Sequence, residues 1–189
     1  VTVDVIEATG GSANISITAT GSSITESDSN AAPRLGAAGS TSTLALTAGT
    51  SIGASGGNAP LSTDVGTLRV TAGGQVDILE ATAIQLGDGT AGVTSSGGNI
   101  TLITTNGAIT TGNNITTIGS NGDITLTSGG TNAITIGNTF TADGSGFIDV
   151  NSGAAFTLSD GITLSSTSGA ITIDTTGANN LTINGTVQT

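Results

Sequence analysis

Carboxylates are the main side chains in this sequence that could act as a catalytic acid or base, because it has 13 acidic residues, two arginines and no histidine, cysteine or lysine. Paired carboxylates hydrolyse glycosidic bonds when about 5 to 9.5 Å separates them. Asp77 and Asp149 hold equivalent positions in the repeat described below, but three repeats, about 14 Å, lie between them. The other acids are dispersed along the chain. We therefore predict a non-enzymatic protein with no catalytic residues.

Calcium binding is a second chemistry that the aspartates could support. The segment Asp143-Gly-Ser-Gly-Phe-Ile-Asp149 is similar to the glycine-rich nonapeptide that binds Ca²⁺ in toxin-type β-rolls, but its spacing differs and it has no tandem copies. Asp88 and Asp160 stand next to glycines and are typical of turns. The absence of cysteine excludes disulfides and cysteine-based metal or redox sites. We predict no metal site and no cofactor.

The net charge of the chain limits the classes of partner that it is expected to bind. The formal net charge is −11, which argues against nucleic acid and against anionic membrane surfaces. No apolar run approaches the ~18 residues of a membrane-spanning helix, so we predict no membrane insertion. Hydrophobic residues make up 35% of the chain, which is not the composition of a disordered protein.

A glycine recurs with a nearly constant period, at intervals of 24, 24, 24 and 23 residues. Each of these glycines precedes two apolar residues that are separated by one other residue. The glycines are Gly74, Gly98, Gly122, Gly146 and Gly169, and the apolar pairs are Val76/Ile78, Ile100/Leu102, Ile124/Leu126, Ile148/Val150 and Ile171/Ile173. The fixed period indicates a repeat protein, and the alternation indicates strands. Together they predict an all-β chain folded as a parallel β-helix, or β-solenoid.

Two further sets of apolar residues follow the same period, and we call each set of equivalent positions a column. The apolar pairs above, with Ile52 as an earlier member, form the first column. The second column is Ile84/Leu86, Ile109, Ile134/Ile136, Phe156/Leu158 and Leu181/Ile183. The third column is Leu44/Leu46, Leu68/Val70, Val93, Ile115 or Ile118, Phe140, Ile162/Leu164 and Val187. Three columns predict three short strands in each coil of about 24 residues.

The chain length then predicts a single domain, residues 1–189, of about eight coils. Asn-Gly pairs such as Asn106-Gly107 would favour hairpins and an antiparallel sandwich or barrel if each were read alone. A hairpin meander would not return the same strand to the same offset five times, which favours the solenoid. Residues 26–34 are polar and contain a proline, so we predict a protruding loop within residues 25–40.

Four short sequence segments resemble segments of a known group of proteins. They are Gly98-Asn-Ile-Thr-Leu102, Asn121-Gly-Asp-Ile-Thr-Leu126, Gly161-Ile-Thr-Leu164 and Gly169-Ala-Ile-Thr-Ile173. This text resembles the β-strand repeats of giant bacterial surface proteins, including filamentous-haemagglutinin-type exoproteins and adhesins. The resemblance covers residues 66–189 well and the first quarter poorly. It implies a secreted, cell-surface protein with a β-helical shaft that has no catalytic residues.

The function predicted from these features is a structural segment of an extracellular bacterial fibre or giant surface adhesin. The chain stops inside its pattern at both ends, so we expect self-contact, either by continuation of the same rod or by end-to-end stacking of a polymerising subunit. A third alternative is an adhesive module that binds a cell-surface or polysaccharide ligand at loop 25–40. A fourth is ice binding by threonines that face outward between the apolar residues, in a rank interrupted by Gln85.

Overall fold

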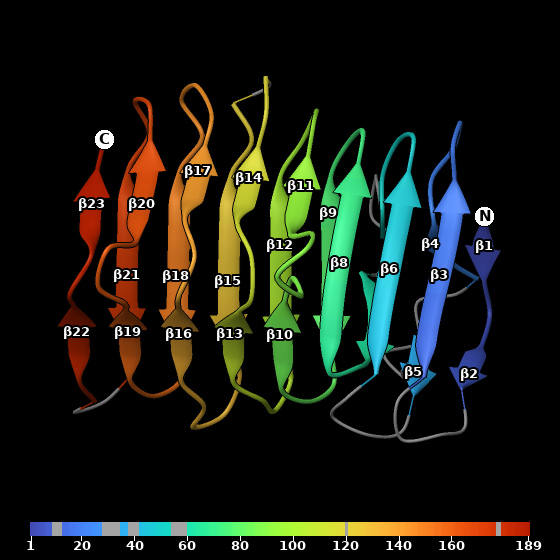
Figure 1. Cartoon of the computed structure of the whole chain (residues 1–189), viewed down its shortest axis with the longest axis horizontal. Helices are drawn as coiled ribbons and strands as arrows, with labels where there is room; N and C mark the ends of the chain where they lie inside the picture. The colour runs from blue at the N-terminus through green and yellow to red at the C-terminus, as the bar shows by residue number, and fades with distance from the viewer. Residues whose placement is uncertain (9–12, 28–34, 38–41, 54–59, 120, 177–178) are drawn as a thin grey trace.

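The computed structural model describes residues 1–8, 13–27, 35–37, 42–53, 60–119, 121–176 and 179–189. In these ranges the regular structure is made of β-strands, and there is no helix that could span a membrane. The strands stack in parallel as a β-solenoid of about seven turns, with roughly 24 residues per turn. Figure 1 shows the coils side by side along the long axis, with the two termini at opposite ends.

One face of the rod is an eight-stranded parallel sheet, which contains the first column. Its strands, in spatial order, are β2 (Ile6–Ala8), β5 (Leu35–Ala37), β7 (Leu61–Asp64), β9 (Val76–Glu80), β12 (Ile100–Thr104), β15 (Ile124–Ser128), β18 (Ile148–Ser152) and β21 (Ile171–Thr175). Ile100 aligns with Val76 on one side and with Ile124 on the other. The first column predicted from the sequence is therefore confirmed.

The other face is a 13-stranded sheet, which Figure 1 shows in front. It begins with three long strands, β3 (Asn14–Ala19), β6 (Thr43–Ala48) and β8 (Thr67–Ala72). One branch continues with β10 (Ile84–Leu86), β13 (Ile109–Thr111), β16 (Ile134–Ile136), β19 (Phe156–Leu158) and β22 (Leu181–Ile183). The other branch continues with β11 (Val93–Ser95), β14 (Ile115–Thr117), β17 (Phe140–Ala142), β20 (Thr163–Ser166) and β23 (Thr186–Gln188). A third sheet pairs β1 (Thr2–Val3) with β4 (Thr25–Glu26).

The shape of the coil changes between β8 and β9, and we call this boundary the coil junction. On the 13-stranded face, β8 pairs with β10 through Leu68 and with β11 through Val70, so one long strand becomes two short strands. On the opposite face two separate segments of the preceding coil pair with one longer strand. There β9 pairs with β7, and its first residue, Val76, pairs with Ile52 through an isolated bridge. The corner of the coil thus moves from one face to the other at the junction.

This arrangement makes two details of the sequence-based prediction more specific and corrects a third, the number of strands per coil. The sheet of eight strands spans about seven turns, where about eight coils were expected. In the long strands one strand serves both the second and third columns, so three short strands per coil hold only from β9 onward. In the third column Ile115 is the inward residue, because it aligns with Phe140, whereas Ile118 is exposed.

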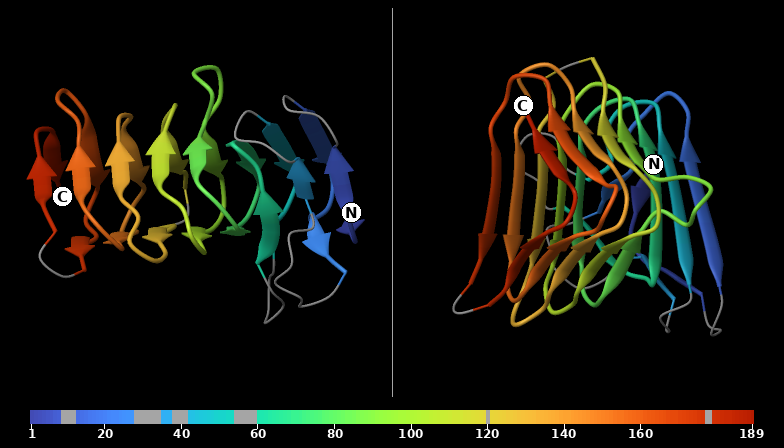
Figure 2. Two further views of the ribbon diagram at one scale, coloured as in Figure 1. Left: turned by 90° about the horizontal axis from the view of Figure 1, so that it is seen from below. Right: turned by 60° about the vertical axis from the view of Figure 1, so that its left-hand side comes forward.

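The core is a continuous cluster of aliphatic side chains, with Phe140 and Phe156 fully buried in it. Phe147 lies before β18 and is 41% exposed, as its corner position predicts. In the last coil, inward residues of the second and third columns are exposed because no further coil lies over them: Leu181, Ile183 and Val187. Figure 2 shows this last coil at the end of the rod that carries the C-terminus.

The predicted loop over residues 25–40 contains two short strands, β4 and β5. These strands take part in the solenoid, so they are not part of a loop. Residues 28–34 and 38–40 lie outside the described residues.

Candidate functional site

Buried hydroxyl groups close the corners of the coil in two rows. In the row at the end of the eight-stranded sheet, each hydroxyl donates to a carbonyl oxygen at its own corner: Thr104 to Gly107 at 2.5 Å, Ser128 to Asn132 at 2.7 Å and Ser152 to Ala155 at 3.0 Å. In the row after the third column, Ser95 donates to Gly98 at 2.7 Å and Thr117 to Gly122 at 2.8 Å at their own corners, whereas Ser166 donates to Gly146 of the preceding coil at 2.6 Å. These rows satisfy corner carbonyls that would otherwise be buried without a partner.

Glu80 occupies the first of these rows at the coil junction. It aligns with Thr63 of the preceding coil and with Thr104 of the following coil, and it is fully buried. A carboxylate can only accept, so its contacts differ from those of the hydroxyls. Glu80 accepts hydrogen bonds from the Thr63 hydroxyl at 2.6 Å and from the Thr82 N–H at 3.1 Å. The Val65 N–H lies 3.2 and 3.3 Å from its two carboxylate oxygens. Glu80 therefore joins the corners of two successive coils.

Burial raises the pKa of Glu80 to about 7, against the hydrogen bonds from Thr63, Thr82 and Val65, which lower it. The nearby carboxylate of Asp64 raises it further. Desolvation has the largest effect on the pKa because no cation contacts Glu80 among the described residues. Glu80 is thus a buried acid that changes its charge near neutral pH.

Two more acids lie around Glu80. Asp64, at the end of β7, accepts a hydrogen bond from the Thr82 hydroxyl at 2.9 Å, and this hydroxyl also lies 3.3 Å from Glu80. Glu26 of β4 accepts a hydrogen bond from the Ser62 backbone N–H. The second oxygen of Glu26 and the Ser62 hydroxyl are buried without a hydrogen-bond partner among the described residues. The coil junction therefore concentrates the buried polar groups of this half of the rod.

The surface beside the junction carries an ion pair. Arg69 of β8 lies 3.1 Å from Asp88, in the turn between β10 and β11. The pKa of Asp88 is lowered to about 2, first by the Thr90 hydroxyl and then by the N–H groups of Ala91 and Thr90, with a smaller contribution from Arg69. Asp88 is thus a turn residue that caps its own loop, as its glycine neighbours predicted. Arg34 lies outside the described residues.

The aspartates considered for chemistry are held apart or bonded to the protein. Asp77 and Asp149 are separated by the rungs of Thr101 and Thr125. Desolvation raises the pKa of Asp77. Asp143 accepts hydrogen bonds from Gly119 and Gly144, and Asp149 accepts one from the Asn151 amide.

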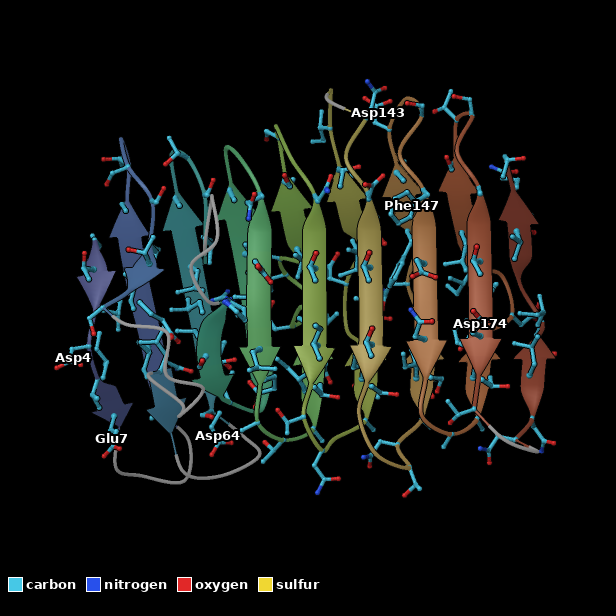
Figure 3. The ribbon with its side chains drawn as sticks, turned by 180° about the vertical axis from the view of Figure 1, so that it is seen from behind. Asp4, Glu7, Asp64, Asp143, Phe147 and Asp174 are labelled. Atoms are coloured by element: carbon cyan, nitrogen blue, oxygen red, sulfur yellow. The ribbon has the colours of Figure 1, made fainter. Side chains whose placement is uncertain are left out.

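Figure 3 shows that the labelled acids lie from one end of the rod to the other. Among the described residues, no three acidic side chains gather closely enough to hold a metal ion. The structure therefore brings together none of the pairs that sequence analysis weighed as catalytic or calcium-binding.

Outward-facing hydroxyl residues form rows along the 13-stranded face. One row, in register order, is Thr18, Thr47, Thr71, Thr94, Thr116, Thr141, Ser165 and Gln188. A second row is Asn14, Thr43, Thr67, Gln85, Thr110, Thr135, Thr157 and Thr182. Neighbouring rungs are about 4.8 Å apart. The rank of threonines with Gln85 as its interruption is therefore a real feature of the surface.

A shallow groove of about 260 Å³ follows the ends of β15, β18 and β21. Its polar lining includes Thr127, Asn151 and Asp174, which lie on successive rungs. Asp174 is labelled in Figure 3. The same positions in the two preceding coils hold Ile103 and Leu79, so the polar groove does not continue toward the N-terminus.

Sequence analysis did not single out Glu80. The signal was present, because the alternation that turns Val76 and Ile78 inward also turns Glu80 inward. No family model matches the chain, and neither a curated protein nor a solved structure matches it. The site must therefore be interpreted from its own chemistry.

Proposed function

We propose that this chain is a structural, non-enzymatic segment of an extracellular shaft, as in a bacterial fibre or giant surface adhesin. The observation that supports this most is the unbroken ladder of the eight-stranded sheet. From β9 to β21 every strand pairs with the next over five residues in the same register. Backbone hydrogen bonds between stacked strands point along the rod, and each coil contacts its neighbours only. Such an arrangement maintains length and stiffness.

The composition of the surface is consistent with a secreted, exposed location. Its outward rows consist mostly of threonine and serine, and the chain has only two basic residues at which trypsin could cleave. Its buried polar groups close corners rather than converge on a reaction centre. We propose the extracellular location from these features and from the resemblance of the repeat text to giant surface proteins.

A second candidate function is self-assembly, which one observation favours. The apolar residues of the last coil, including Leu181 and Ile183, hold inward column positions and are exposed at this end of the rod. Another coil would bury them, supplied by the same polypeptide in a longer shaft or by a second copy in a filament. Electron microscopy of purified chain over a range of concentrations separates the two, because a filament lengthens with concentration and a shaft segment does not.

Force spectroscopy of the chain between two handles tests the shaft function. Coils that detach one at a time should release about 80 Å of contour length each, which is roughly 24 residues at about 3.4 Å per residue. A series of resisted steps of this size is expected. Extension without measurable resistance would reject a structural shaft. A variant that lacks residues 28–34, between β4 and β5, should give the same steps and serves as the matched control.

The same deletion variant tests the adhesive alternative, because loss of binding to a cell-surface or polysaccharide ligand would assign that ligand to the segment. Ice binding stays a prediction, and thermal hysteresis of the purified chain is the measurement for it. The interruption of the threonine rank at Gln85 weakens that candidate.

A further inference from the structure

The coil junction combines a change of coil shape with a buried acid that bonds to both sides of the change. On one side lie β7 and the turn that begins at Val65, and on the other lies the turn after β9 with Thr82. Hydroxyls of the two rows elsewhere also bond to a neighbouring coil, as Ser95 does to the Gly74 carbonyl oxygen, but they carry no charge. Glu80 contacts groups in two coils as well, so the junction depends on one side chain whose charge can change.

We propose that the coil junction is a pH-sensitive joint, held closed by Glu80 when its carboxyl group is neutral and loosened when that group ionises. In the neutral form one oxygen accepts from the Thr82 N–H, while the carboxyl O–H donates to the Thr63 hydroxyl across the same 2.6 Å contact. Both oxygens of the neutral carboxyl group then remain in hydrogen bonds. Ionisation places a negative charge in the core, and the hydrogen bonds from Thr63, Val65 and Thr82 offset its loss of solvation only in part.

Among the described residues, no positive group faces Glu80 and offsets this charge. Among the described residues of the coils before β9, the titratable groups near the junction are Asp64 of β7 and, one coil farther away, Glu26 of β4, both acidic. On its own strand the other titratable group is Asp77, and β12, which packs on the other side, contributes none. The nearest basic residue of the junction, Arg69, lies on the outward side of β8 and pairs with Asp88. The neighbours therefore oppose ionisation.

The sign of the pH effect follows from the direction of the shift. The pKa of Glu80 is raised in the folded chain to about 7 from the ordinary 4.5. Its contribution to stability is therefore complete below about pH 4.5 and is lost as the pH rises through about 7. The difference between the two pKa values sets the largest possible effect. The equilibrium constant for opening of the junction can increase at most about 300-fold from low to high pH. Nothing further changes above that range.

Two measurements on the intact chain test the joint. The first is an NMR titration of the Glu80 side-chain carboxyl, which should have a midpoint near 7. The second is amide hydrogen exchange of Val65 and Thr82, corrected for the pH dependence of chemical exchange. Protection of these amides should fall as the pH rises from 4.5 to 8, while that of Ile124, deep in the rod, should stay unchanged.

The variant Glu80→Gln keeps a neutral group of the same shape, so its junction amides should keep constant protection over that range. Asp64→Asn is the matched control, because it removes the partly buried neighbouring acid and leaves Glu80, and it should retain the pH response with a slightly lower midpoint. An ordinary Glu80 midpoint, near 4.5, would overturn the proposal, as would a pH response in Glu80→Gln equal to that of the native chain. If Glu80→Gln fails to fold, the titration and exchange of the native chain decide alone.

Discussion

Replacing Ile124 by alanine tests the stacking that underlies the whole rod. Ile124 lies on β15, is fully buried, and aligns with Ile100 on one side and Ile148 on the other. The substitution removes three carbon groups at about 0.8 kcal/mol each, or about 2.4 kcal/mol of transfer free energy. The stacked column cannot collapse into the space without moving both neighbouring coils, so a cavity term raises the loss to about 3–5 kcal/mol.

Urea denaturation followed by circular dichroism measures this loss as a change in the free energy of unfolding. Thr125→Ala is the matched control, since Thr125 lies on the same strand, faces outward and should cost less than about 1 kcal/mol. Ile171→Ala, in the same column but only partly buried at the end of the rod, should give an intermediate loss. Equal losses for Ile124→Ala and Thr125→Ala would refute the assignment of the column to the core.

Three further predictions concern corners and turns. Gly122→Ala should destabilise the chain by about 1–3 kcal/mol in the same denaturation assay, because its Cβ would lie 2.4 Å from the Gly98 carbonyl oxygen; an unchanged midpoint would show that the corner is looser than described. Thr104→Val should cost about 1–3 kcal/mol, since it leaves a buried corner carbonyl without its donor, and a neutral result would remove the hydroxyl row from the stabilising interactions. Thr90→Ala should raise the pKa of Asp88 from about 2 toward its ordinary value of 3.8, measured by NMR titration, and no shift would contradict the turn-capping role.

The period of the sequence was sufficient to predict the solenoid and its first two columns. Each Ile or Val of the first column follows a glycine at a fixed offset, so the repeat itself sets the register. The third column was ambiguous at Ile115 and Ile118, because both are apolar residues near a threonine. Their exposure depends on where the corner begins, and hydrogen bonding to the neighbouring coils decides that.

The shape change at the coil junction was not predictable from local pattern. The pair Leu68/Val70 has the same alternating pattern as every other apolar pair. Its two members nevertheless align with different strands, β10 and β11, which residues 87–92 separate. Glu80 shows the same limit in chemical terms. Alternation places it inward, but its raised pKa depends on donors and acids contributed by the preceding coil, which no local window contains.

The hydroxyl row at the end of the eight-stranded sheet has a consequence for how such a molecule can evolve. Thr104, Ser128 and Ser152 each bond within their own coil, so a unit of about two dozen residues carries its own corner closure. An in-frame duplication of that stretch of gene would insert one more rung of about 4.8 Å without requiring any compensating substitution. Recombination between repeats could therefore lengthen or shorten the polypeptide in uniform increments.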